Sequence, residues 1–411
     1  MYKAASNSQF SSSRLNVLSL IDFCKGLAIV WVFFYHYSKT WFGWQGVHVF
    51  IVLSGFGLTY SCLQKNKQIS WKQWYFRRAE RILPVYWLVS LLGFLFLACI
   101  NLRKSYIDIA TDIINPTINL LSNLSIVRNL SYQTIFNYPN DQLWFVPLIF
   151  SLYMIFPLLY TLALRYRTVK GCLLLLIGTI IAEFVYRSIS VYLLDGLPVG
   201  FQTPIWNGMQ NLVLEPVDKI PNNFFFPFQG SAPFGLFPAR IAEFMLGMFG
   251  AIYLVRDKHG FNRIFSTSTL VLGIVIWLIG YALVYIGLWG WAFASFFIAL
   301  GLVIWTINLA LFCQRSLSPL FIALSQVGVW SYYIFLTHSV VIHVFEFQVF
   351  INIEKRLLEN NLFWFLLFKG CILIVMVFAT AITSFLVMQF DKSKLPKLLM
   401  QRIFEKKYVQ M

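Results

Sequence analysis

Apolar residues in this chain come in long runs, and polar residues gather between the runs. Each run is about 20 residues long, enough for a helix rising about 1.5 Å per residue to cross the hydrocarbon core of a bilayer. The predicted fold class is therefore an all-α polytopic integral membrane protein. The predicted membrane helices lie at roughly residues 19–38, 46–63, 82–101, 142–164, 170–189, 239–255, 266–287, 290–313, 320–346 and 362–389, about ten in number.

The composition supports this class. Apolar residues make up 59% and charged residues 12% of the 411 residues, whereas a soluble domain carries about 25% charged residues. So few polar residues cannot cover a water-soluble domain of this size. We predict three parts: a disordered cytoplasmic tail over residues 1–18, a transmembrane domain over 19–390 and a basic cytoplasmic tail over 391–411.

The net charge of +16 lies mostly between the apolar runs. Alternate polar segments hold most of the lysines and arginines, and the positive-inside rule then predicts that both termini are cytoplasmic. These basic segments predict contact with the lipid bilayer and its anionic headgroups, and no nucleic acid partner is expected. Two long loops, about 102–140 and 190–238, face outward in this topology. The aromatic run Phe224–Phe228 makes the second loop too apolar for a solvated segment, so we expect it to pack over the mouth of the bundle.

The first predicted helix carries three ionisable residues on one face. Lys25 and His36 are eleven residues apart. At about 100° per residue they project in nearly the same direction, roughly 16.5 Å apart along the axis. Asp22 precedes Lys25 by three residues and joins that face. This stripe suits a long donor with an anionic head at the membrane surface, such as a coenzyme A thioester. An interfacial Asp–Lys pair with a separate structural histidine is the alternative.

Two clusters near the ends of other helices are open to two interpretations each. Arg77, Arg78 and Arg81 precede the third run, where they can anchor the topology, clamp phosphate oxygens, or do both. Arg240 and Glu243, three residues apart, favour a structural ion pair.

The remaining polar positions give weaker signals. The second helix contains His48 and the segment Ser54-Gly55-Phe56-Gly57, and close helix packing is the favoured interpretation of its glycines. His48 can lie near His36 on the outer half. His338 and His343 are five residues apart and fall on different helical faces, so they predict no two-histidine metal site. No metal cofactor is expected.

Six segments with a mixture of small, aromatic and basic residues follow one another along the chain. They are Ile21–Ala28 with Tyr35-His36, Gly46–Phe56, Phe76–Trp87, Leu143-Trp144-Phe145, Arg240 with Glu243-Phe244 and Leu246-Gly247, and Ser331-Tyr332 with Phe335-Leu336 and His338. In this order they resemble the motifs of the acyltransferase family 3 membrane proteins, whose first helix has a basic residue, ten residues and then histidine. Lys25 stands where the family usually has arginine, His48 where an acidic residue is frequent, and Ile149-Phe150 where a glutamate pair is common. No fused hydrolase-like domain is expected after the last helix.

The resemblance implies transfer of an acyl group, commonly acetyl from cytoplasmic acetyl-CoA, to a hydroxyl of an envelope carbohydrate such as an exopolysaccharide or lipopolysaccharide. It also implies a multi-pass protein of the bacterial inner membrane. His36 would act as general base or as transient acyl carrier, and Asp22 would orient Lys25. Coenzyme A phosphates would be held by Lys25, Arg77, Arg78 and Arg81. Substrate-binding candidates are His48, Ser54, Arg240, Glu243, Tyr332 and His338.

The aromatic outer loop would form a platform for the sugar rings of the acceptor. Two other classes compete with the enzyme: a transporter or exporter of a glycan or small solute, and a scaffold subunit without chemistry. The ordered motifs favour the acyltransferase.

Overall fold

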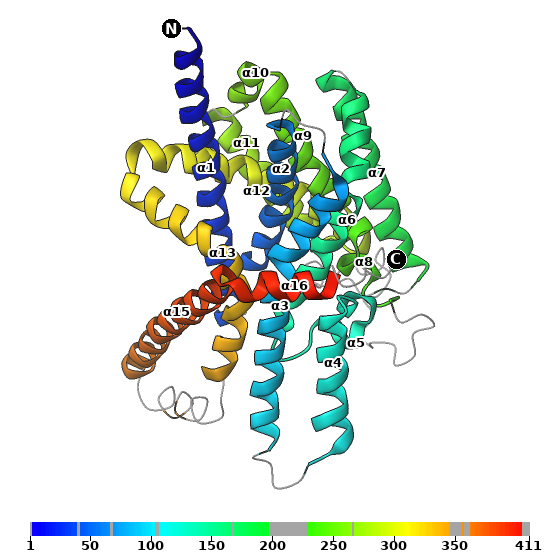
Figure 1. The fold of residues 1–411 in the computed structure, drawn as a ribbon, viewed down its shortest axis with the longest axis vertical. Helices are drawn as coiled ribbons and strands as arrows, with labels where there is room; N and C mark the ends of the chain where they lie inside the picture. The colour runs from blue at the N-terminus through cyan, green and yellow to red at the C-terminus, as the bar shows by residue number, and fades with distance from the viewer. Residues whose placement is uncertain are drawn as a thin grey trace.

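The computed structural model is a helical bundle that describes residues 2–38, 42–65, 69–102, 107–166, 168–194, 196, 228–264, 267–345, 353, 356 and 362–404 (Figure 1). These residues contain no β-strand. The long helices are α1 (Tyr2–Ser38), α2 (Gly46–Leu63), α3 (Trp71–Asn101), α6 (Phe145–Arg165), α7 (Val169–Tyr192), α9 (Ile241–Arg256), α11 (Thr267–Leu283), α12 (Leu288–Ser316), α13 (Ser318–Phe345) and α15 (Leu362–Lys392).

Nine helices in the described part of the chain are long and apolar enough to cross a membrane. They correspond to nine of the ten predicted runs, which confirms an all-α polytopic membrane protein. The tenth run, predicted over 266–287, is the shorter apolar helix α11. It ends at Leu283 because the chain turns through residues 284–286 before α12 begins at Leu288.

Two helices extend beyond the apolar runs that predicted them. The third helix was predicted to start at residue 82, but α3 begins at Trp71. Hydropathy marks only the part of a helix that lies in lipid, whereas helix-forming polar residues continue the same helix into the interface. The first helix, α1, begins at Tyr2, within the segment predicted to be a polar tail, and its membrane span starts at Val17. The three-part division of the chain stays a prediction.

The outward loops are partly helical. The stretch predicted as a loop over 102–140 contains a π-helical turn η2 (Ile109–Ile114), α4 (Asn115–Leu124), a 3-10 turn η3 (Arg128–Leu130) and α5 (Tyr132–Ile135). α4 packs against α3, and the two form the hairpin at the bottom of Figure 1. The aromatic segment 224–227 lies outside the described residues, and the second loop is described from Phe228 onward, through α8 (Ala232–Gly235) and the 3-10 turn η6 (Phe237–Arg240).

Short elements complete the chain around the bundle. The 3-10 turns η1 (Phe42–Gln45) and η4 (Asp141–Trp144) lead into α2 and α6. Two further helices, α10 (Lys258–Arg263) and α16 (Lys394–Phe404), follow α9 and α15. α16 is drawn in red across α3 in Figure 1, and its Met400 is buried in the core.

Glycines allow two pairs of helices to approach with their backbones nearly touching. A Cβ on Gly328 of α13 would lie 1.7 Å from the carbonyl oxygen of Asp22 in α1. A Cβ on Gly247 of α9 would lie 1.8 Å from the carbonyl oxygen of Val52, and one on Gly55 of α2 would meet Phe244. Without a hydrophobic driving force in lipid, such close backbone packing is a main source of helix association. It fixes α13 against α1, and α9 against α2.

Candidate active site

Two imidazole rings, one from α1 and one from α13, lie close together. The ring centroids of His36 and His338 are 4.9 Å apart, and the rings meet nearly edge to face. His36 lies near the C-terminal end of the membrane span of α1, and His338 lies in the C-terminal half of α13. The contact between α1 and α13 therefore brings together two histidines that are 302 positions apart in the sequence.

Asp141 lies between two histidines from different helices. Its Oδ2 is 3.8 Å from His36 Nδ1, and its Oδ1 is 3.8 Å from His343 Nε2. Ser339 donates its hydroxyl hydrogen to the same carboxylate. We call His36, Asp141, His338 and His343 the histidine–aspartate centre. The carboxylate can orient the His36 ring and stabilise its protonated form, as an aspartate does for the histidine of a catalytic triad.

The hydrogen bonding of His338 defines its tautomer. Its Nδ1 lies 3.0 Å from the carbonyl oxygen of Ile334. A carbonyl oxygen only accepts hydrogen bonds, so the proton is assigned to Nδ1 and Nε2 carries the lone pair. This Nε2 atom is buried and has no hydrogen-bond partner in the described part of the chain. His338 thus offers a basic nitrogen next to His36.

A cavity of about 440 Å³ lies along the same two helices, towards the N-terminal part of α1. Six of the predicted site residues line it: Asp22, Lys25, Ser54, Arg78, Arg81 and Tyr332. Lys25 Nζ is 3.8 Å from Asp22 Oδ1, as their spacing predicted. Three cations against one carboxylate give the wall a positive charge, and we call this space the basic cavity.

Arg77 differs from its neighbours. It is exposed on α3 and is not among the residues that line the basic cavity. Arg78, one position on, lines the cavity and lies over the Trp74 ring, 5.5 Å from its centroid. The three arginines therefore do not form one cluster, because successive residues of a helix point about 100° apart.

Phe335 connects the basic cavity with the histidine–aspartate centre. It lines the cavity, and its ring centroid is 5.9 Å from that of His338. Phe50 and Phe145 also line the cavity and pack on Phe335, with ring centroids 6.3 and 5.2 Å away. These three rings form an aromatic partition at the inner end of the cavity.

His48, Arg240 and Glu243, three of the predicted substrate-binding residues, contact one another. His48 Nδ1 is 3.0 Å from Glu243 Oε2, and Arg240 donates to Glu243 Oε1 at 2.8 Å. All three side chains are buried. The crossing of α2 and α9 at Gly55 and Gly247 brings them together, and the predicted Arg240–Glu243 ion pair is confirmed.

Two further charged residues complete this buried network. Arg187 of α7 donates to Ser295 Oγ at 2.7 Å, and Arg240 donates to the same oxygen at 2.9 Å. Glu183 accepts a hydrogen bond from the backbone N–H of Ala242 at 2.8 Å. Two arginines thus face two glutamates inside the bundle. A buried ion pair needs this balance, since removing one partner leaves a charge without compensation.

The sequence interpretation missed Asp141, Glu183 and Arg187. Glu183 and Arg187 stand four residues apart inside an apolar run, which is a usable signal for a buried pair. Asp141 is a single acidic residue just before an apolar run, and nothing nearby in the sequence links it to His36. His343 was considered only as a metal ligand. In the described residues, no group of three or more His, Cys, Asp or Glu side chains is arranged to hold a metal ion.

A polytopic helical bundle with a histidine–aspartate centre beside a basic cavity has the layout of a membrane-embedded enzyme. Comparison with known families specifies the class: the model of a family described as an acyltransferase domain matches residues 18–381. The chain therefore belongs to the acyltransferase family 3.

One curated relative agrees with this assignment. Peptidoglycan O-acetyltransferase OatA of Listeria monocytogenes serovar 1/2a is 26% identical over 177 residues. This match covers 41% of the present chain and 28% of that protein, so less than a third of the relative is represented. No solved structure matches the chain.

Proposed function

We propose that the protein is a membrane O-acyltransferase that moves an acetyl group from cytoplasmic acetyl-CoA to a hydroxyl of an extracytoplasmic or lipid-linked carbohydrate. The observation that carries this proposal is the arrangement along α1. Lys25 lines the basic cavity, and His36, on the same helix, lies against Asp141 and His338. A donor site and a proton-transfer site thus share one rigid element within an acyltransferase domain.

The basic cavity is the proposed donor site. Lys25, Arg78 and Arg81 present three cations, and guanidinium groups bind phosphate oxygens with two parallel hydrogen bonds. The inner wall is apolar, with Phe50, Phe145 and Phe335, and suits the uncharged pantetheine arm of coenzyme A. In this arrangement the phosphates stay at the cytoplasmic end while the thioester points towards His338.

The proposed reaction at the centre transfers the acyl group from the thioester sulfur of coenzyme A to the oxygen of the acceptor hydroxyl. His36 removes the proton of the acceptor hydroxyl, and the oxygen attacks the thioester carbonyl carbon. When the tetrahedral intermediate collapses, the C–S bond breaks and the coenzyme A sulfur takes the proton from the His36 imidazolium. Asp141 stabilises that imidazolium through its carboxylate, 3.8 Å from Nδ1. An acyl-histidine intermediate on His36 is the alternative route.

The acceptor side of the proposal rests on the relative and on topology. The relative is named as acting on peptidoglycan, so an envelope glycan is the proposed acceptor class for this chain. With both termini in the cytoplasm, the α3–α4 hairpin faces outward (Figure 1). The proposed location is the inner membrane of a bacterium.

The function is tested by mass spectrometry of envelope glycans from cells with the gene, without it and with single variants. The unmodified gene is expected to add a mass of one acetyl group. His36→Ala is expected to abolish this addition while the protein remains in the membrane. Asp141→Asn is expected to lower transfer by about 10²-fold or more, the usual scale of lost general-base catalysis, without changing coenzyme A affinity.

Asp108→Asn is the matched control for Asp141→Asn. Asp108 is exposed, and its side chain caps the start of η2, a role that asparagine can also fill. Full acetylation in His36→Ala cells would contradict the proposed catalytic role. Solute flux through vesicles that lack acetyl-CoA, with no acetylated glycan in cells, would support a transporter instead.

A further inference from the structure

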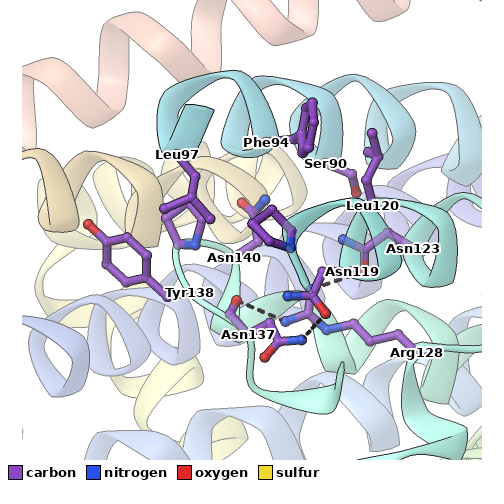
Figure 2. A pocket seen from close by; sticks show the side chains of 12 residues that line it. Ser90, Phe94, Leu97, Asn119, Leu120, Asn123, Arg128, Asn137, Tyr138 and Asn140 are labelled. Carbon is purple, nitrogen blue, oxygen red and sulfur yellow. Dashed lines mark hydrogen bonds between the residues drawn. The ribbon is translucent and has the colours of Figure 1, made fainter. Parts of the chain in front are cut away.

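A second pocket lies between α3, α4 and the segment that leads to Asp141 (Figure 2). Its wall is rich in carboxamide groups, and an aromatic ring borders it. The lining includes Asn119, Asn123, Asn137, Asn140, Arg128 and Tyr138. We call it the amide pocket. It is narrow, with a cavity volume of about 20 Å³, and it opens to solvent.

Arg128 holds the wall of the amide pocket in place. The guanidinium donates through Nε to the carbonyl oxygen of Ile135 at 2.9 Å and through Nη1 to Asn123 Oδ1 at 3.0 Å. Nη2 donates to the carbonyl oxygen of Asn137 at 3.2 Å (Figure 2). Burial lowers the pKa of Arg128 to about 10, so the side chain is still charged at neutral pH. Three protein oxygens accept hydrogen bonds from this guanidinium. The groups left in the pocket wall for a ligand are therefore mainly amides.

Asn140 carries a buried oxygen atom with no hydrogen-bond partner among the residues that the structure describes. The residue is 5% exposed, and the unpartnered atom is Oδ1. Its amide group rests on Gly93 of α3, where a Cβ would lie 1.9 Å from Nδ2. An unsatisfied buried acceptor costs about 1–3 kcal/mol, which favours a role in binding a donor from outside the protein.

The amide pocket and the histidine–aspartate centre lie on either side of one short segment. Tyr138 lines the pocket, and its ring centroid is 4.6 Å from that of His343. Asn140 directly precedes Asp141, and Ser339 contacts both Asp141 and the carbonyl oxygen of Pro139. A ligand held by Asn140 would therefore be separated from the carboxylate that pairs with His36 by the width of this segment.

We propose that the amide pocket is the acceptor subsite, in which Asn140 Oδ1 accepts a hydrogen bond from a hydroxyl of the carbohydrate. The proposal rests on the function proposed above and specifies where the acceptor binds. Carboxamide groups satisfy hydroxyl donors and acceptors alike, and the Tyr138 ring offers an apolar face to a sugar ring. The narrow space admits one hydroxyl or hydroxymethyl edge of a sugar unit, with the rest of the glycan outside.

The test uses the full-length protein in cells that lack the gene, with the cells' own envelope glycans as acceptor. Acetate released from the glycans by alkali is measured for each variant, together with the thermal stability and coenzyme A affinity of the purified protein. Asn140→Ala is expected to lower released acetate at least fivefold, while coenzyme A affinity stays within twofold. Its thermal stability is expected to stay equal or rise, because the change removes an unsatisfied buried oxygen.

Gly93→Ala is a second variant, in which a change in α3 disturbs the same Asn140 amide group. The added Cβ would displace the Asn140 amide, so released acetate is expected to fall in this variant as well. Asn115→Ala is the matched control, since Asn115 lies exposed at the start of α4 and does not line the pocket.

Wild-type acetate levels in Asn140→Ala cells would overturn the subsite. A joint loss of stability and coenzyme A binding would also overturn it, because that result assigns Asn140 a structural role. If the unmodified gene itself adds no acetate to the glycans, the proposed function has failed. If only the subsite proposal is wrong, the unmodified gene still adds acetate to the glycans.

Discussion

Arg77 and Arg78 are neighbours in the sequence but have different surroundings in α3. Arg78 lines the basic cavity, whereas Arg77 is exposed outside it. We therefore expect Arg78→Ala to weaken coenzyme A binding about tenfold or more, since a hydrogen bond to a charged group contributes about 1.5–3 kcal/mol. Arg77→Ala is the matched control and should leave the affinity nearly unchanged. Isothermal titration of the purified protein with coenzyme A measures both.

Equal effects of the two changes would contradict the donor site. If the arginines only anchor the topology, each variant should instead alter membrane insertion to a similar extent. Insertion is checked by protease accessibility of the loops on the two sides of the membrane.

Sequence spacing predicts contacts between residues of one helix far better than contacts between helices. Asp22 and Lys25 pair as expected because three residues make nearly one turn. Asp141 and His338 reach His36 only through packing of η4 and α13 on α1, which no local spacing encodes. Spacing could not predict the contacts of His48 for the same reason, because its partners come from η6 and α9 and lie almost 200 positions further along the chain.

At the scale of helices, the crossing of α1 and α13 determines where the donor-side and histidine residues lie. Gly328→Val should destabilise the protein by about 1–3 kcal/mol or more, because its side chain would enter the backbone of α1 at Asp22. Moving α13 away from α1 should also lower acyl transfer, since both helices line the basic cavity. The unfolding temperature in detergent, followed by tryptophan fluorescence, is the measurement.

Gly178→Ala in α7 is the control for that crossing. A Cβ there meets no heavy atom of the described residues within 4 Å, and alanine is the better helix former. Its unfolding temperature should therefore equal or exceed that of the unmodified protein. A similar drop in both variants would mean that the α1–α13 contact has no special role in stability.

Helix positions are largely predictable from hydropathy, and helix ends are less so. The apolar run at 46–63 coincides with α2, because both ends of that helix meet polar or turn-forming residues. The start of α3 was wrong by eleven residues, since Trp71–Arg81 is helical but not apolar. The amide pocket was not predictable, as its asparagines come from a stretch that was interpreted as a loop.

At the scale of the whole molecule, the aromatic partition lies between the proposed donor and acceptor sides. Phe335 contacts the basic cavity on one side and the His338 ring on the other. A thioester that reaches His36 must pass or displace these rings, so the room beside them should limit the length of the acyl chain. Additional methylene groups would clash with the close-packed rings, at a cost of about 1–3 kcal/mol.

Phe335→Ala should therefore change donor selectivity. We expect the ratio of kcat/KM for butyryl-CoA to that for acetyl-CoA to rise about tenfold, because the smaller side chain leaves space for two more methylene groups. Replacing a buried phenylalanine also costs about 3–5 kcal/mol of stability. The ratio of two donors in one preparation is independent of the folded fraction and is the quantity to measure. Phe363→Ala, at an exposed site on α15, is the control. An unchanged ratio in Phe335→Ala would show that the partition does not set the length of the transferred group.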